Sequence, residues 1–254
     1  MTREFLPEVE AIGNALAAEA GQYLRSINRS LEGLCESCAL PVNADRSRCY
    51  QCRRHVEASL PLADRVTSLI YAVEPDTQAY LTVRNYKAPR TGPSLVQKMQ
   101  ELLAVSLRGH VECLVSVSGA PVDGWAIVPS RGGRPALRDL VVALARDPHQ
   151  EIGITLQYDP GRRLLDPEAW VADISGDPPA HMLVIDDSWV SGASAQSVAS
   201  SLKQAGVEQV SIFTVARILK TNLTEINEFV KGQLPSMEFD WRRCPWTKKG
   251  ACPD

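Results

Sequence analysis

The stretch of residues 181–205 restricts the fold of this chain more than any other. It opens with the short apolar run MLVI at residues 182–185, whose length and β-branching are typical of a buried parallel strand. Two acids and a turn of small and hydroxyl-bearing residues follow, and apolar residues then recur at helical spacing. The stretch therefore predicts a strand, an anion-binding turn and a helix.

The predicted turn has the chemistry of a phosphate site. The first N–H groups of a helix lack intrahelical partners and lie at the positive end of the helix dipole. Gly192 lets the backbone approach an anion closely, and Ser191 and Ser194 add hydroxyl donors. Asp186 and Asp187 precede this turn, and carboxylates accept hydrogen bonds from ribose hydroxyls. We therefore expect a ligand that carries both phosphate and ribose.

Two CxxC pairs form the second strong pattern. Cys35, Cys38, Cys49 and Cys52 are separated by a ten-residue spacer, residues 39–48. Paired knuckles of this kind converge four thiolates on one tetrahedral ion, which predicts a closed structural zinc site. His55 follows the second pair, and because four cysteines complete the site we expect it to be a surface histidine.

Arginines surround the predicted zinc ribbon. Such side chains can contact nucleic-acid phosphates, or they can form a solvated face or contact acidic groups of the same chain. Both interpretations stay open for Arg46, Arg48, Arg53 and Arg54. Over the whole chain the net charge is −3, so no overall basic footprint for nucleic acid is present.

The composition and the order of elements predict an α/β protein. The 254 residues contain no run of eighteen apolar residues, and the N-terminus lacks the plan of a secretory signal, so we expect a cytoplasmic protein without a membrane segment. Strands alternating with helices predict a parallel sheet that binds ligands beyond the carboxyl ends of its strands. Expected strands are residues 125–128, 153–158, 182–185 and 210–216, and expected helices are residues 9–34, 94–107, 135–146 and 221–230.

The predicted domains follow this order. An N-terminal amphipathic helix occupies residues 1–34, the four-cysteine zinc ribbon residues 35–58, the α/β domain residues 59–220, and a C-terminal helix and tail residues 221–254. In the tail, Cys244 and Cys252 are expected as separate thiols, with half of a further metal site or a return of the tail to the ribbon as the alternatives. Cys113 is expected as a small buried apolar residue.

Residues 184–194, VIDDSWVSGAS, resemble the phosphoribosyl pyrophosphate (PRPP) motif of type I phosphoribosyltransferases. Val190 stands where that motif usually has its first threonine, and serines stand at the other two hydroxyl positions. Together with the preceding ribbon, the motif resembles the ComF-like (competence protein F) family, closest to an actinobacterial branch. Residues 84–87, RNYK, and residues 126–134, AIVPSRGGR, are similar to further segments of that family.

The resemblance implies a type I phosphoribosyltransferase-like sheet that binds PRPP and Mg²⁺. The expected PRPP-binding residues are Asp186, Asp187, Val190, Ser191, Gly192, Ala193, Ser194, Ser130, Arg131, Gly132, Gly133 and Arg134. The expected catalytic residues are Asp187, as a candidate base, and Arg131, Arg162 and Arg163. The last two lie in the long connection of residues 159–180, which is interpreted either as a lid over pyrophosphate or as a solvated surface excursion.

Three classes of function remain open at the level of sequence. The first is a phosphoribosyltransferase that moves phosphoribosyl to or from a nitrogenous acceptor. The second is a regulator that binds PRPP or a nucleotide without turnover, which the valine at position 190 favours. The third is a nucleic-acid-associated protein, linked to DNA uptake or processing, whose ribbon contacts DNA. Homodimer formation is left open in all three.

Overall fold

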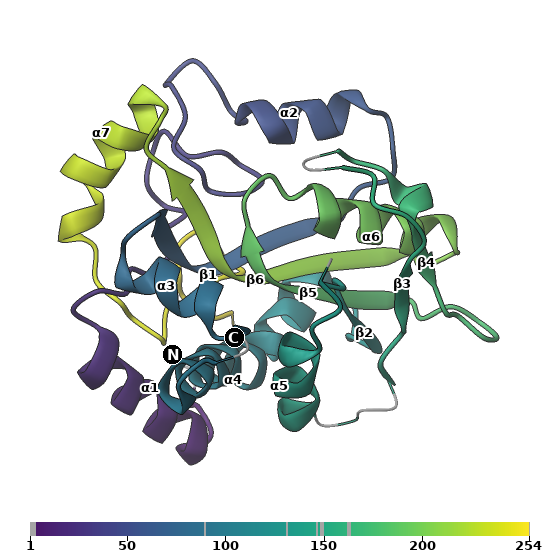
Figure 1. Ribbon diagram of the computed structural model, residues 1–254, viewed down its shortest axis with the longest axis horizontal. Helices are drawn as coiled ribbons and strands as arrows, with labels where there is room; N and C mark the ends of the chain where they lie inside the picture. The colour runs from purple at the N-terminus through teal and green to yellow at the C-terminus, as the bar shows by residue number, and fades with distance from the viewer. Residues whose placement is uncertain are drawn as a thin grey trace.

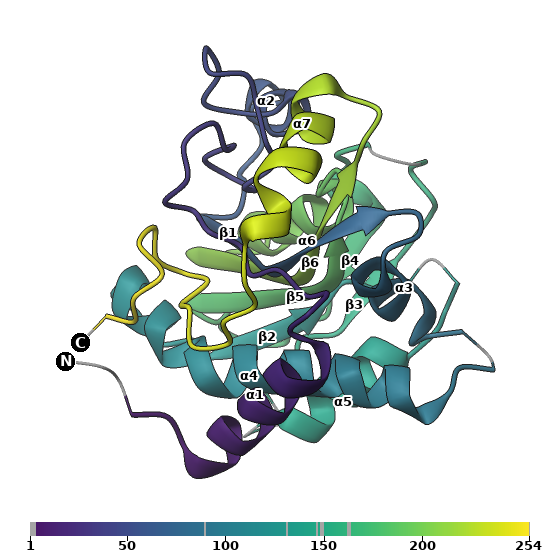
Figure 2. The same cartoon turned by 90° about the vertical axis from the view of Figure 1, so that its left-hand side faces the viewer.

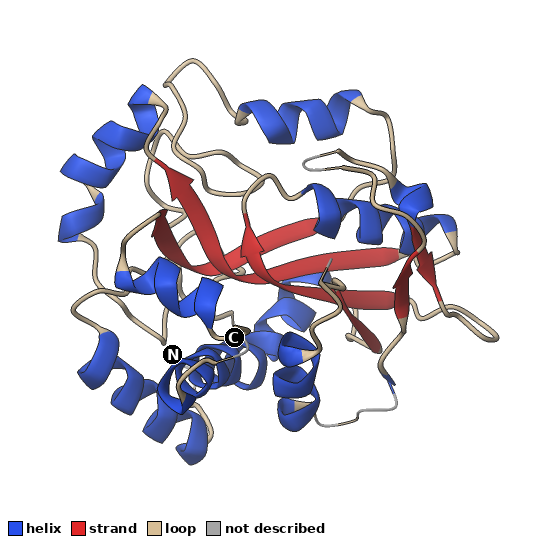
Figure 3. Ribbon diagram, in the orientation of Figure 1, coloured by secondary structure: helices blue, strands red, loops and turns tan. Residues whose placement is uncertain are grey.

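A four-stranded parallel sheet forms the centre of the computed structural model, which describes residues 4–88, 90–130, 132–145, 147, 150–161 and 164–253. The strand order is β1–β6–β5–β2, and helices cover both faces (Figures 1 and 3). This confirms the α/β class with a parallel sheet flanked by helices. The strands are β1 (Arg65–Glu74), β2 (Gly124–Ile127), β5 (His181–Trp189) and β6 (Gln209–Lys220).

Strand β5 lies between two neighbours and is buried on both faces. Successive side chains of a strand point to opposite sides, so Leu183 and Ile185 enter one core while Met182 and Val184 enter the other. A strand buried in this way needs a continuous apolar run, which the sequence provides. The strand continues through Asp186 and Asp187 to Trp189, so the acids are part of β5 and do not follow it.

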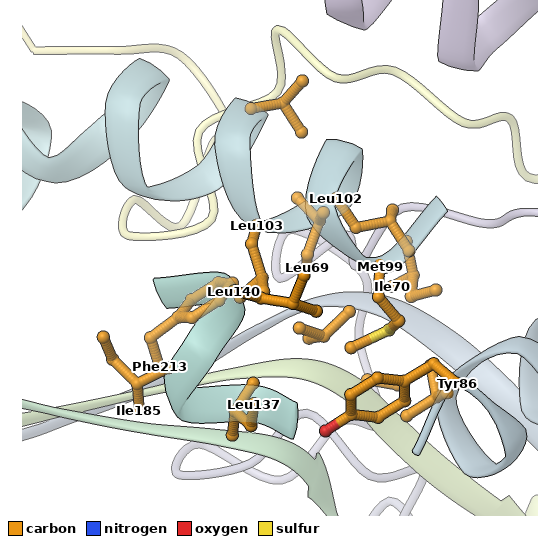
Figure 4. Close-up of a cluster of buried hydrophobic side chains, with 14 of the residues drawn as sticks. Leu69, Ile70, Tyr86, Met99, Leu102, Leu103, Leu137, Leu140, Ile185 and Phe213 are labelled. Atoms are coloured by element: carbon orange, nitrogen blue, oxygen red, sulfur yellow. The ribbon is translucent and has the colours of Figure 1, made fainter. Parts of the chain in front are cut away.

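One face of the sheet carries four helices, which are drawn below it in Figure 1. They are α1 (Pro7–Ala20), α3 (Gln78–Asn85), α4 (Pro93–Ser118) and α5 (Ala136–Leu144). Figure 2 shows α1 running beside α4, the long helix of this layer. Figure 4 shows the core between α4, α5 and the sheet, with Leu102, Leu103, Leu140 and Phe213 in contact and the ring of Tyr86 at its edge.

The opposite face carries α6 (Ala193–Gln204) and, above it, the cysteine ribbon with α2 (Tyr50–Glu57). A separate antiparallel pair, β3 (Ile154–Leu156) with β4 (Trp170–Ala172), packs against α6 together with the short helix η2 (Pro167–Ala169). The prediction that residues 153–158 add a strand to the parallel sheet was therefore wrong, because this segment pairs with part of the connection that follows it.

The N-terminal helix is shorter than predicted. It ends at Ala20, and the helix predicted to reach residue 34 gives way to extended chain. Ile27 N–H donates to the Leu69 carbonyl at 3.0 Å, and Ser26 forms an antiparallel bridge with Ile70 of β1. Of the apolar side chains at helical spacing in this segment, Leu24 and Ile27 are buried, and Tyr23, Leu31 and Leu34 are half-buried. The pairing with β1 also covers the edge of the sheet, which would otherwise present unpaired backbone groups.

The C-terminal part also differs in extent from the prediction. Strand β6 continues beyond residue 216 to Lys220, so Arg217 lies within the sheet. Helix α7 (Thr224–Gly232) and the short helix η3 (Leu234–Ser236) follow, and the described tail, residues 237–253, has no regular secondary structure. None of the helices in the described residues has both the length and the apolar character that crossing a membrane requires.

Candidate functional site

A cavity of about 950 Å³ lies where β2 and β5 end. This is the place where parallel α/β sheets bind ligands. Every predicted PRPP-binding residue that the structure describes lines this cavity: Asp186, Asp187, Val190, Ser191, Gly192, Ala193, Ser194, Ser130, Gly132, Gly133 and Arg134. Arg131, Arg162 and Arg163 lie outside the described residues. The fold thus brings two loops, more than fifty residues apart in sequence, to one cavity.

The turn between β5 and α6 depends on a glycine. Gly192 has a φ of +78°, and a Cβ atom at this position would lie 2.0 Å from Cζ2 of the buried Trp189. No residue with a side chain fits here without movement of the tryptophan or the turn. Helix α6 begins at the next residue, and Ser191 Oγ accepts a hydrogen bond from Ala193 N–H at 3.4 Å. The start of α6 therefore faces the cavity with its backbone N–H groups.

The two acids of β5 lie in different surroundings. Asp187 is buried, and its carboxylate accepts hydrogen bonds from Tyr86 Oη at 3.0 Å and from Ser188 Oγ at 2.8 Å. It also forms a salt bridge with Lys87. Tyr86 and Lys87 were absent from the predicted site residues, although the RNYK segment that contains them was recognised as similar to a family segment. The buried carboxylate of Asp187 is thus held by the phenol of Tyr86 and the ammonium group of Lys87.

Asp186 is half-buried and forms no salt bridge with the described residues. Its carboxylate accepts the backbone N–H of Asp187 at 2.8 Å. Burial, with the neighbouring charge of Asp187, raises the pKa of Asp186 to about 8, and Lys87 only partly opposes this. A carboxyl group with a raised pKa that faces a cavity is characteristic of a functional site.

This raised pKa predicts a pH-dependent stability. The folded protein holds the proton of Asp186 up to about pH 8, whereas the unfolded chain releases it near 3.8, so the wild type loses stability as the pH rises between these values. Asp186→Asn removes this loss. In Mg²⁺-free buffer its free energy of unfolding should match the wild type near pH 4 and exceed it by a margin that grows as the pH rises to 8.

Urea denaturation across this pH range measures the difference between the variants. Asp177→Asn, a change at an exposed acid away from the cavity, is the control and should follow the wild type at every pH. A difference in free energy of unfolding between Asp186→Asn and the wild type that stays the same at every pH would contradict the raised pKa of Asp186.

The second loop of the cavity follows β2. Gly133 has a φ of +64°, and its N–H donates to the Ser130 carbonyl at 2.9 Å, which closes a tight turn. Arg134 is exposed and its Nη1 donates to the Lys87 carbonyl at 3.4 Å. Arg84 and Arg138 also line the cavity. Three arginines therefore line the cavity, where they could neutralise an anionic group, although the guanidinium of Arg138 is paired with the carboxylate of Glu151 at 2.7 Å.

The four ribbon cysteines converge as predicted. All are buried, their sulfur atoms lie within 4.8 Å of one another, and Cys38 Sγ lies 3.7 Å from Cys49 Sγ. Sulfur atoms around a tetrahedral zinc lie about 3.8 Å apart, given a Zn–S bond of about 2.3 Å. The donor set and its spacing therefore fit a closed metal site such as that of zinc, in which no ligand position is left for water.

Two arginines, the half-buried Arg29 and the buried Arg217, tie the ribbon to the sheet. Arg29 donates to three backbone carbonyls, those of Glu36, Ser37 and Val66. Arg217 in β6 donates from Nη1 to the carbonyls of Trp189 at 2.8 Å and Val190 at 3.2 Å, in the cavity turn.

Arg217 acts on the cysteines as well. Burial opposes ionisation of Cys38, but hydrogen bonds from the other three cysteines and the charge of Arg217 lower the pKa of this thiol well below its usual value. One guanidinium thus touches the cavity turn and lies beside the ribbon cysteines.

His55 differs from its prediction as a surface residue. It is 4% exposed, and desolvation by burial lowers its pKa. Helix α2 begins directly after Cys49, so residue 55 falls on the inward face of this helix, one turn after Cys52. His55 does not belong to the four-cysteine cluster, in agreement with the expectation that the cysteines complete the site.

The four ribbon arginines, for which a contact with nucleic acid was one of two open interpretations, are all exposed. Arg48 lies 3.6 Å from a carboxylate oxygen of Glu36, and Arg53 lies 3.5 Å from one of Glu57. Arg53 and Arg54 also lie over the ring of the exposed Tyr50. The ribbon therefore presents an aromatic side chain flanked by positive charge, with part of that charge balanced locally.

Comparison of the chain with protein-family models, with curated proteins and with solved structures found no match. The function of the cavity must therefore be argued from its own chemistry. That chemistry consists of a helix start, two acids in different surroundings and a rim of basic side chains, all at one end of the parallel sheet.

Proposed function

We propose that the cavity binds PRPP with Mg²⁺ and that the protein transfers phosphoribosyl to or from a nitrogenous acceptor, with pyrophosphate as the leaving group. One observation carries the proposal. The glycine-dependent turn before α6, the acids Asp186 and Asp187, and the described residues 129, 130 and 132–134 of the second loop all line the same cavity. This set of groups matches the phosphate, the ribose hydroxyls and the pyrophosphate of PRPP, in that order.

The placement of PRPP follows from the local chemistry. Its 5′-phosphate would receive backbone N–H groups at the start of α6 and the hydroxyls of Ser191 and Ser194. The ribose hydroxyls would donate to Asp186 and Asp187. Pyrophosphate would lie toward residues 129–134, where backbone N–H groups and Arg134 neutralise its charge.

Mg²⁺ fits this arrangement because it prefers oxygen ligands. The Asp186 carboxyl lines the cavity without a salt bridge to the described residues, so it is the group we assign to hold the ion directly or through water. When bound, Mg²⁺ would neutralise part of the charge on pyrophosphate. Asp187 is less suited to this, since Lys87 and Tyr86 already hold it.

The chain's own residues would then assist the transfer. The nitrogen of the acceptor forms a bond to the anomeric carbon, and the bond from that carbon to pyrophosphate breaks, with its electron pair leaving on pyrophosphate. The proton released by the nitrogen would pass to Asp187 or a neighbouring acid. Tyr86 and Lys87 would orient Asp187 for this role, and Lys87 would also compensate negative charge in the cavity.

Isothermal titration with PRPP and Mg²⁺ tests the proposal, followed by a pyrophosphate-release assay against a panel of nitrogenous bases. The double variant Asp186→Asn, Asp187→Asn should bind PRPP at least about 30-fold more weakly, the loss of roughly 2 kcal/mol expected when the charged acceptor Asp187 becomes neutral and residue 186 can no longer ionise to hold Mg²⁺. The control is the double variant Asp76→Asn, Asp177→Asn, which changes two exposed acids outside the cavity. Absence of PRPP binding, or equal binding by both double variants, would refute the proposal.

A regulator that binds PRPP without turnover is the second candidate. Two observations favour it: Val190 is 38% exposed at a position that offers no hydroxyl to the phosphate, and Asp187 is already bound to Lys87 and Tyr86. Binding of PRPP without pyrophosphate release for any base in the panel would select this function.

The exposed Tyr50 with Arg53 and Arg54 favours a contact with nucleic acid, since bases stack on aromatic rings and arginines neutralise phosphates. DNA binding that weakens with salt and is lost in the Arg53→Ala, Arg54→Ala variant would identify this third function. Equal DNA binding by this variant and the wild type would exclude the ribbon as the contact.

A further inference from the structure

A second cluster of metal-ligating side chains lies far from the ribbon in sequence. It consists of His110, Cys113, Cys244 and Cys252, whose potential ligand atoms all lie within 4.8 Å of one another. The first three are buried and Cys252 is half-buried. Two come from the middle of α4 and two from the irregular tail, so more than 130 residues separate the two halves.

The distances within the cluster match a tetrahedral ion. His110 Nδ1 lies 3.8 Å from Cys113 Sγ and 3.5 Å from Cys252 Sγ. In a tetrahedral zinc site a nitrogen and a sulfur ligand lie about 3.6 Å apart, given bonds of about 2.0–2.1 Å and 2.3 Å. Three thiols and one imidazole form one of the usual ligand sets of structural zinc.

The histidine is oriented as a metal ligand requires. Its Nε2 lies 3.0 Å from the Trp241 carbonyl oxygen, which accepts a hydrogen bond only if Nε2 carries the proton. Nδ1 is then left with its lone pair, directed at the cysteines. A backbone carbonyl that fixes the tautomer of a ligating histidine in this way is a regular feature of zinc sites.

Local structure explains how each half forms. His110 and Cys113 are three residues apart in α4, so their side chains lie on the same face of the helix. In the tail, Cys244 N–H donates to the Gly250 carbonyl at 2.8 Å. This hydrogen bond closes a loop and so brings Cys252 close to Cys244. Gly250 has a φ of +77°, and a Cβ atom there would lie 2.7 Å from Arg243 Nη1.

The sequence predicts separate thiols, with half of a further metal site as an alternative, and the grouping of Cys244 and Cys252 with His110 and Cys113 favours that alternative. The seven-residue spacing of Cys244 and Cys252 matches no knuckle, because the other two ligands come from a helix and not from a second knuckle. The cluster is distinct from the four ribbon cysteines, so the tail does not reach back to the ribbon as a ligand.

We infer that His110, Cys113, Cys244 and Cys252 form a second structural zinc site, which fastens the tail to α4. The tail has a reason to need such a fastening. It has no regular secondary structure, yet it places the buried Trp241 against Phe5 and α1 and supplies the Pro245 carbonyl to Thr67 of β1. One ion bound to both α4 and the tail would supplement the few backbone hydrogen bonds that the tail makes with the rest of the chain, such as that of Ser26 N–H to the Glu238 carbonyl.

Metal analysis of the full-length protein, purified under reducing conditions, tests this inference. Plasma mass spectrometry should find two zinc ions per chain in the wild type. Cys252→Ser should lose one of them and Cys49→Ser the other, since each change removes one ligand of one site. The control is Lys249→Ala, a change at an exposed tail residue, which should keep both ions.

Cobalt supplies a second readout that does not depend on the folding of Cys252→Ser. The Cys49→Ser chain loaded with Co²⁺ should retain the visible absorption bands of a single tetrahedral site with three thiolates and one nitrogen. One zinc per chain in the wild type would overturn the inference, as would a disulfide between Cys244 and Cys252 in the intact mass. Loss of both ions in Cys49→Ser, with no tetrahedral cobalt spectrum, would overturn it as well.

Discussion

Cys38→Ser should lower the free energy of unfolding by about 3–5 kcal/mol, because it removes a ligand of a buried metal site and leaves the remaining thiolates uncompensated. Cys38 is 2% exposed and belongs to the same buried cluster as Met182, Val184 and Trp189. The ribbon is thus part of the core above α6 and not a separate appendage. Its loss should expose this core and destabilise the whole α/β domain.

Guanidinium denaturation and zinc content, measured on the same samples, check this result. Ser47→Ala is the matched control: it lies between the two CxxC pairs, its side chain is exposed, and it should leave both quantities unchanged. A Cys38→Ser protein that loses its ribbon zinc but keeps the stability of the wild type would show that the ribbon folds independently of the sheet.

Gly192→Ala should weaken PRPP binding by about 100-fold and destabilise the protein by about 3 kcal/mol. Two effects add at this position. The backbone has a φ of +78°, which residues with a side chain adopt at a cost, and the new methyl group would lie 2.0 Å from the ring of Trp189. Either the tryptophan leaves its buried place or the turn moves away from the start of α6.

Gly119→Ala separates these two effects. Gly119 ends α4 with a φ of +74°, but a Cβ atom there would meet no atom within 4 Å. This control should cost only the backbone strain, about 1 kcal/mol, and leave PRPP binding intact. Titration calorimetry and thermal denaturation of both variants give the comparison. Equal losses in the two variants would mean that contact with Trp189 does not hold the turn in place.

The features that sequence predicted correctly depend on neighbouring residues. The β5–α6 unit follows from an apolar run, a glycine and helical spacing within twenty-five residues, and the ribbon follows from two CxxC pairs within eighteen. In both cases the chemistry and the local structure are encoded in one short segment. Three of the four strands of the parallel sheet were predicted for the same reason, from the alternation of such segments, whereas β1 was not predicted.

The features that were missed depend on contacts across the chain. Residues 21–34 do have apolar residues at helical spacing, but their backbone groups bond to β1 and to the tail. These long-range hydrogen bonds compete with helix formation, and no local sequence pattern reveals them. Strand β3 pairs with β4 and not with the main sheet for a similar reason. Lys87 reaches Asp187 across one hundred residues, so only the fold shows that the two form a salt bridge.

Arg217 joins the ribbon and the cavity in a way that has a thermodynamic consequence. Its guanidinium binds the carbonyls of Trp189 and Val190 and lies beside Cys38. If a metal ion bound at the ribbon changes the ligand affinity of the cavity by some factor through this side chain, ligand bound in the cavity must change the metal affinity by the same factor. The reason is that the coupling between two binding sites is reciprocal. A saturated cavity would then change the affinity of the ribbon for its metal by that same factor, so that the metal and the cavity ligand would act on one equilibrium.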